Sequence, residues 1–183
     1  NHRTMSVPDD GHTERSPRTH GIIPRMPERI FAIGDIHVCS DALRTLVEAI
    51  DPQPDDTIVS LGDIINYGPD TRGTFEQLIE LSGRCHLILL IGNHEEMLSQ
   101  AINGRDDRRY WESCGGETTR RCYPDQGDDE LIDPVHFDFL KRNCRDYHET
   151  SQFIYVDANY FPNRPMPEQD GYTLRSEFVR PHQ

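Results

Sequence analysis

The chain has 183 residues and a formal net charge of −13, a length that suits one domain with its own hydrophobic core. The acidic excess argues against broad electrostatic binding to nucleic acid or to anionic membranes, and no apolar run reaches the roughly 18 residues of a membrane span. The five cysteines include no Cys-x-x-Cys pair, and the N-terminus lacks the hydrophobic segment of a signal peptide, so we predict a cytoplasmic protein without a disulfide framework.

Residues 1–28 combine Pro, Gly, Ser, Thr and charges of both signs with almost no apolar periodicity. Such a segment cannot bury enough surface to order itself, so we predict a disordered tail followed by one domain over residues 29–183. The chain begins with Asn1 rather than methionine, which is typical of a fragment.

Strand and helix patterns alternate from residue 29 onward. "RIFAI", "TIVSL" and "HLILLI" are short apolar runs typical of buried strands, and "DALRTLVEAI" places Leu43, Leu46, Val47 and Ile50 on one helical face. A second helix is predicted to begin at Thr74, in a capping box with Gln77, and to end at Gly83. A third, "HEEMLSQAIN", precedes Gly104. This β-α-β-α-β-α order predicts an α/β fold, with a parallel sheet covered by helices.

The pattern is weaker beyond Gly104. Residues 105–130 are polar and predict a loop or small helical insert anchored by Trp111. A further helix is predicted to begin at Pro134 with Asp133 as its N-cap. "SQFIYVDANY" then predicts a strand that ends in Asp157, and "GYTLRSEFV" a short helix.

Polar side chains follow each of the first three predicted strands. The three turns read "GDIH", "GDIINYGPD" and "GNHE", and their first glycines, Gly34, Gly62 and Gly92, are 28 and 30 residues apart. Because parallel strands all point the same way, these turns should meet at one edge of the sheet. The alternative is that Asp35, Asp63 and Asn93 only form Asx turns.

The side chains that would meet there are carboxylates, an amide and imidazoles, the donors that match Mn, Fe or Zn ions, whereas cysteines would be expected at a soft thiolate site. Two cations held together need a bridging carboxylate, and Asp63 on the central strand can supply it. A metal pair about 3.5–4 Å apart can clamp a phosphoryl group and activate water.

These three turns resemble the ordered signature blocks of the calcineurin-like metallophosphoesterases, and "WESCGG", "YVDANY" and "LRSEF" resemble the bacterial serine/threonine protein phosphatase branch. The resemblance implies a β-sandwich flanked by helices (α-β-β-α), two divalent metals, with Mn²⁺ the first choice in vitro, and attack of a metal-bound hydroxide on a phosphomonoester. The roles that it implies are metal binding by Asp35, His37, Asp63 and Asn93, general acid catalysis by His94, and phosphate contact by Arg175.

The chain also departs from the family's pattern. Val38 replaces a glycine, and Asn66 and Tyr67 replace an Asp-Arg pair that charges the catalytic histidine and grips phosphate. Asn66 can accept a hydrogen bond from His94 but cannot supply a full charge, so we expect weaker acid catalysis. Tyr67 can donate one hydrogen bond to phosphate, and Ile91 replaces a further arginine. Asp157 stands at a histidine ligand position and can bind the same metals.

The family's later Gly-His-Thr block does not occur before the end of the chain, so we expect a domain that is incomplete at the C-terminus, with reduced metal affinity. Three hypotheses therefore stand. The first is a phosphatase that acts on a phosphoprotein or a small phosphomonoester. The second is a phosphodiesterase or dinucleoside polyphosphate hydrolase, towards which "INYGPD" leans because it lacks the arginine. The third is a relative that binds metal or a phosphorylated partner without turnover.

Overall fold

A computed structural model describes residues 29–127 and 130–177. The strands are β1 (Ile30–Ile33), β2 (Thr57–Ser60), β3 (His86–Leu90), β4 (Cys144–Arg145), β5 (His148–Glu149) and β6 (Ile154–Tyr155). The α-helices are α1 (Ser40–Ile50), α2 (Thr71–Ser82), α3 (Asn93–Asn103), α4 (Arg105–Trp111), α5 (Glu117–Arg121), α6 (Pro134–Asn143) and α7 (Gly171–Ser176). A π-helical turn, η1 (Glu112–Gly116), joins α4 to α5, and a 3₁₀ turn, η2 (Met166–Glu168), precedes α7. The predicted tail, residues 1–28, lies outside the described residues.

The main sheet is parallel, with strand order β1-β2-β3-β4. Ile30 is in register with Thr57, and Thr57 in turn with His86, so the first three strands begin and end together. Their carboxyl ends therefore lie at one edge of the sheet, and the predicted α/β class is confirmed.

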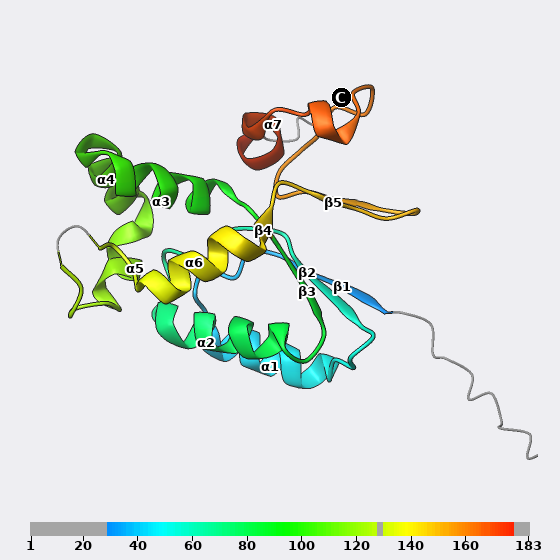
Figure 1. Ribbon diagram of the computed structural model, residues 1–183, viewed down its shortest axis with the longest axis horizontal. Coiled ribbons are helices and arrows are strands. Elements are labelled where there is room, and N and C mark those ends of the chain that lie inside the picture. Colours follow the sequence, from blue (N-terminus) through cyan, green and yellow to red (C-terminus); the bar gives the residue numbers. More distant parts are fainter. Residues whose placement is uncertain (1–28, 128–129, 178–183) are drawn as a thin grey trace, which may run out of the picture.

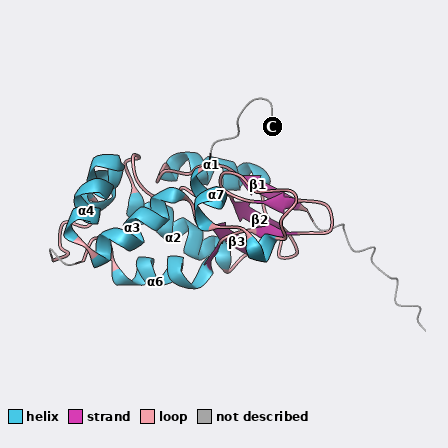
Figure 2. Cartoon of the chain, turned by 90° about the horizontal axis from the view of Figure 1, so that it is seen from above, coloured by secondary structure: helices cyan, strands magenta, loops and turns pink. Residues whose placement is uncertain are grey.

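Helices α1, α2 and α6 cover one face of this sheet (Figure 1). Sheet residues such as Ile58 and Leu89 share one buried cluster with Phe75 and Leu78 of α2 and Leu140 of α6. In α1 the predicted apolar face is only partly buried, since Leu43 is 3% exposed and Leu46 is 41% exposed. The view from above shows α3 and α4 extending away from the sheet (Figure 2).

A smaller cluster, formed by Val59, Ile88 and Leu90, lies on the other face of the sheet and contacts Tyr155 of β6. The resemblance implied a second sheet in a sandwich. Within residues 29–127 and 130–177, the second sheet consists of β5 and β6, which pair antiparallel.

Three helices begin after an aspartate whose side chain caps them: α2 after Asp70, α6 after Asp133 and α7 after Asp170. The prediction that Thr74 caps α2 is wrong: the helix begins at Thr71, and the Asp70 carboxylate accepts a hydrogen bond from the N–H of Gly73 at 2.9 Å. Asp70 also accepts a hydrogen bond from the hydroxyl of Ser40 at 2.7 Å, which joins the start of α1 to that of α2. The predicted start of α6, with Asp133 as N-cap, is confirmed.

The segment after α3 forms the helical insert α4-η1-α5. Trp111 is fully buried, as predicted, and a side chain at Gly116 would collide with its ring, because a Cβ there would lie 2.2 Å from it. The insert is thus packed onto the rest of the domain through Trp111. All five cysteines are free, and within the described residues no helix is long and apolar enough to cross a membrane.

Candidate metal centre

The turns after β1 and β2 are joined by backbone hydrogen bonds. The N–H groups of Ile36 and His37 donate to the carbonyl of Asp63 at 3.1 and 2.9 Å, and the N–H of Val38 donates to the carbonyl of Ile64 at 2.8 Å. These bonds place the predicted donors of both turns beside each other at the carboxyl edge of the sheet, as the parallel topology predicted.

The backbone of these two turns is strained. Five of the six described non-glycine residues with positive φ lie here, and they are His37, Val38, Asp63, Asn66 and Tyr67. Val38 is the most unusual, because a β-branched residue rarely takes a φ of 46°, and it is fully buried. Each such residue costs about 1–3 kcal/mol and persists only where its surroundings hold it, which is characteristic of functional sites.

At two of the three turns, a side chain larger than that of glycine would collide with a neighbouring residue. Gly62 has a φ of 112°, and a Cβ there would lie 2.3 Å from Oδ1 of Asp157. At Gly92 a Cβ would lie 2.1 Å from Oδ1 of Asp63. Both glycines therefore leave room for a carboxylate. At Gly34 a Cβ would meet open space, so the structure gives no steric reason for glycine there.

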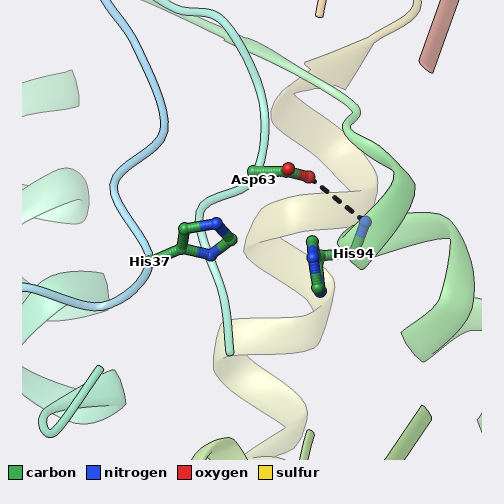
Figure 3. A group of neighbouring side chains, drawn as sticks. All are labelled: His37, Asp63 and His94. Carbon is green, nitrogen blue, oxygen red and sulfur yellow. Dashed lines mark hydrogen bonds between the residues drawn. The ribbon is translucent and has the colours of Figure 1, made fainter. Parts of the chain in front are cut away.

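Two groups of donors meet around Asp63. His37, Asp63 and His94 form one group, and Asp35, Asp63 and Asp157 form the other; within each group the ligand atoms lie within 4.8 Å of one another. Figure 3 shows the side chains of the first group turned towards a common space. Asp63 is the residue that the two groups share, as the predicted bridging ligand would be. The structure thus pairs His37 with His94 across Asp63, and Asp35 with Asp157.

The orientation of His37 suits a metal ligand. Its Nδ1 lies 2.9 Å from the carbonyl of Ile65 and donates to it, so Nε2 carries the free lone pair. That Nε2 faces Asp35 at 4.0 Å. A backbone carbonyl that fixes the imidazole in this way is a common partner of a metal-binding histidine.

Asn93 completes the donor set. Its side-chain amide lies 3.1 and 3.2 Å from the two oxygens of Asp63. The amide nitrogen can donate to them, whereas the amide oxygen can face them only if a cation lies between. The backbone N–H of His94 also donates to Oδ1 of Asp63, at 3.2 Å (Figure 3).

The residues fit divalent cations on electrostatic grounds. Burial raises the pKa of Asp63 above its ordinary value. Burial, followed by the negative charges of Asp63, Glu95 and Asp35, raises the pKa of Asp157 to about 8. Carboxylates that repel one another in this way need either a proton or a cation, and hard oxygen donors beside imidazoles match the Mn, Fe or Zn class.

Glu95 is a buried residue that the sequence analysis did not assign. Its carboxylate accepts hydrogen bonds from the N–H groups of Asp63, Ile64, Ile65 and Gly92, at 2.8 to 3.1 Å. Burial, and then the charge of Asp63, raise the pKa of Glu95 to about 7. Glu95 holds the turn after β2 against the start of α3, and its position three residues after Gly92 is the capping-box signal that could have identified it.

The geometry around His94 corrects one expectation. Asn66 was expected to accept a hydrogen bond from His94. Instead its amide nitrogen lies 2.7 Å from Nδ1 of His94, while its amide oxygen accepts a hydrogen bond from the Thr119 hydroxyl at 3.0 Å. Asn66 therefore donates to Nδ1, which leaves the proton of neutral His94 on Nε2. Burial also lowers the pKa of His94, so the neutral form is favoured twice.

Tyr67 and Arg175 were both predicted to contact substrate. The ring of Tyr67 lies edge to face with His37 and with His94, at 5.1 Å in each case, and is 57% exposed. Arg175 has a side chain that is only 12% exposed and is paired with Glu96 at 2.7 Å and with Asp146. The predicted phosphate contact by Arg175 stays a prediction, in which the guanidinium would bind phosphate while these two carboxylates hold it.

Comparisons with known proteins agree with this arrangement. The sequence matches the calcineurin-like phosphoesterase family over residues 28–173, which includes all the donors described above. The chain belongs to that family. Calcineurin-like phosphoesterases are divalent-metal-dependent hydrolases, and the structure contains groups of carboxylate and imidazole donors that could hold such ions.

Two similar calcineurin-like phosphoesterases are symmetrical bis(5'-nucleosyl)-tetraphosphatases. The one from Acidovorax sp. is 28% identical over 153 residues, which are 82% of this chain and 50% of the relative. The one from Xylella fastidiosa is 34% identical over 82 residues, or 44% of this chain and 27% of the relative. The chain thus spans about half the length, or less, of these curated relatives.

A solved structure described as that of a candidate diadenosine tetraphosphatase shares the fold. It superposes with a TM-score of 0.58 at 22% identity, over 83% of this chain and 60% of the other. The parallel sheet and its helices are therefore arranged as in that structure.

The pKa of Asp157 leads to a prediction for the metal-free protein. An isolated aspartate has a pKa near 3.9, so between about pH 4 and pH 8 unfolding would release the proton that the folded carboxyl retains. The raised pKa therefore means that stability is lost as the pH rises through this window. We expect the Tm of the wild type in EDTA to fall relative to that of Asp157→Asn between pH 4 and 8, as measured by calorimetry. A constant difference would contradict this prediction.

Proposed function

We propose that this protein is a divalent-metal-dependent hydrolase that cleaves a phosphoanhydride bond in a dinucleoside polyphosphate. The observation that carries the proposal is that Asp63 belongs to two donor groups, one with His37 and His94 and the other with Asp35 and Asp157. Within the first group we assign His94, whose pKa is lowered by burial, to proton transfer rather than to a cation. The names of the relatives support the choice of substrate, and they favour the second hypothesis over a serine/threonine protein phosphatase.

The roles follow from the geometry. Asp35, His37, Asp63, Asn93 and Asp157 would hold two cations, with Asp63 shared between them. When bound, the cations would neutralise phosphate charge and provide an activated water as nucleophile. Mn²⁺ is the ion that we propose to test first, because it accepts both oxygen and imidazole ligands.

His94 would donate the proton that the leaving oxygen needs, and Asn66 would position its ring. The N–H donor of Asn66 lies at Nδ1, where a second proton must reside in the imidazolium form. In imidazolium, the N–H at Nδ1 of His94 would point at the N–H of Asn66, and the two donors would repel each other. The protonated form of His94 is therefore disfavoured, and little of it is available to donate a proton at neutral pH.

Because little protonated His94 is available, the site should favour substrates whose leaving group needs no proton. Hydrolysis of a serine phosphate expels an alkoxide, which is strongly basic and needs a proton in the transition state. Hydrolysis of a phosphoanhydride expels a phosphate oxygen, whose second pKa is about 6 and which can leave as the anion. A site with Asn66 in place of an aspartate is therefore better suited to anhydrides than to alkyl monoesters.

The test compares leaving groups in one assay. With Mn²⁺ present, we expect kcat/KM for diadenosine tetraphosphate to exceed that for a phosphoserine peptide by about a hundredfold or more, because general acid catalysis is worth roughly 10²–10⁴. A series of aryl phosphates should also show rates that fall steeply as the pKa of the phenol rises. Equal rates for the peptide and the anhydride would contradict the proposal. If metal binds without hydrolysis of any substrate, the third hypothesis, a binding protein without turnover, is favoured.

A further inference from the structure

An exposed tyrosine, Tyr67, lies beside the candidate metal centre, and a second, Tyr110, lies close enough to Tyr67 to interact with it electrostatically. Tyr67, in the turn after β2, is 57% exposed, and Tyr110, on α4, is 62% exposed. We refer to Tyr67 and Tyr110 together as the tyrosine rim. Exposed aromatic side chains present a flat apolar face on which a planar ligand can stack.

The two rings are connected through the insert. Tyr67 packs against Gly115, where a Cβ would lie 2.6 Å from the ring, and its N–H donates to the Gly115 carbonyl at 3.4 Å. Tyr110 lies on α4, one helical turn before Cys114, and the neighbouring Cys114 and, more weakly, Tyr67 raise the pKa of its hydroxyl. The two members of the tyrosine rim therefore meet at the Cys114–Gly115 turn, and Tyr67 joins this turn to the metal centre.

The backbone around Tyr67 has an unusual conformation, and the Tyr67 ring is nevertheless exposed. The φ of Tyr67 is 65°, that of Asn66 is 72° and that of Gly115 is 92°, all in the left-handed region. A bulky residue in this conformation costs about 1–3 kcal/mol, and here the cost does not lead to burial. The geometry instead holds an aromatic ring at the mouth of the site, 5.1 Å from the rings of both histidines.

The charge of the chain makes an aromatic contact useful. A formal charge of −13 repels a polyanion, and Tyr67 and Ile91 stand where the family has arginines. Fewer cationic side chains are thus available to grip phosphate, so affinity must come from the cations and from the uncharged part of the ligand. Every nucleobase offers a flat π-face that stacks on tyrosine.

We propose that the tyrosine rim is a nucleobase subsite, on which a base of the substrate stacks while its phosphates lie at the metal centre. This inference rests on the proposed function, because it names the part of a dinucleoside polyphosphate that the chain recognises. Tyr67 would contact the portion next to the phosphates, and Tyr110 would provide the outer stacking surface.

The first test uses Tyr110, which lies outside the metal centre. We expect Tyr110→Ala to raise KM for diadenosine tetraphosphate about tenfold, as expected for the loss of one stacked base, and to leave hydrolysis of inorganic tetraphosphate unchanged. Tyr110→Phe should retain the wild-type KM, because it keeps the ring and removes only the hydroxyl. Tyr172→Ala, which removes a tyrosine that is 68% exposed on α7, is the matched control. Equal effects of Tyr110→Ala on both substrates would overturn the inference.

A binding measurement separates the subsite from the activity. By calorimetry with Mn²⁺, the wild type should bind AMP about tenfold more tightly than ribose 5-phosphate, and Tyr110→Ala should remove this preference. If the wild type shows no preference for AMP, the inference fails whether or not hydrolysis occurs. If the preference is present and no dinucleoside polyphosphate is hydrolysed, the subsite stands and the proposed function is wrong.

Discussion

Replacing Asp63 with asparagine should lower kcat by about a thousandfold or more, without destabilising the metal-free protein. Asp63 is the one residue present in both donor groups, so its loss weakens the binding of both cations, and a thousandfold loss corresponds to about 4 kcal/mol of transition-state stabilisation. Asparagine has the same shape, and its amide oxygen can still accept the N–H of His94.

The stability of this variant is the informative part of the experiment. Burial raises the pKa of Asp63, which means that the charged carboxylate lowers the free energy of unfolding of the metal-free protein. A neutral amide at this position removes that destabilisation. We expect the Tm of Asp63→Asn in EDTA to equal or exceed that of the wild type, while the rise in Tm on adding Mn²⁺ disappears.

The matched control is Asp41→Asn, which changes a 90% exposed side chain on α1 in the same chemical way. It should leave the response to Mn²⁺ intact. A large loss of Tm for Asp63→Asn in EDTA would show that Asp63 has a structural role and would remove it from the proposed bridge.

Much of this centre could be predicted from the sequence because it depends on patterns in consecutive residues. Apolar runs of strand length, separated by helical periods, predict β1, β2 and β3 in one parallel sheet, and parallel topology then brings Asp35, Asp63 and Asn93 to one edge. No long-range contact had to be known. The same local reasoning identified Asp133 and Pro134 at the start of α6.

The remainder depends on contacts between residues that are distant in the sequence. Thr119, 53 positions from Asn66 in the sequence, orients the Asn66 amide through its hydroxyl. Without knowledge of this contact, one cannot infer whether Asn66 donates a hydrogen bond to His94 or accepts one from it. Arg175 is paired with Glu96, 79 positions away, a contact that local sequence patterns do not indicate. Sequence patterns contain no information about such pairs, so the role of a polar residue was harder to predict than its position.

The turn around Asn66 leads to the second large effect, a gain of function. Replacing Asn66 with aspartate should raise kcat for substrates with basic leaving groups by about ten- to a hundredfold, within the range that general acid catalysis provides. An aspartate accepts a hydrogen bond from Nδ1–H and stabilises imidazolium, whereas Asn66 donates to Nδ1 and opposes it. The Thr119 hydroxyl, which now donates to the amide oxygen of Asn66, can donate equally to the new carboxylate.

The pH dependence of this variant distinguishes acid catalysis from a general change in the site. Burial keeps the pKa of His94 low in the wild type, so the protonated fraction, and with it the rate on aryl phosphates, should fall as the pH rises through neutrality. A carboxylate at position 66 raises that pKa and should move the alkaline limb of the rate profile to higher pH. Hydrolysis of diadenosine tetraphosphate should change less, because its phosphate leaving group needs little protonation. Asn66→Ala, which removes the donor without adding charge, should not reproduce the gain, and an equal gain with alanine would refute the role assigned to the aspartate.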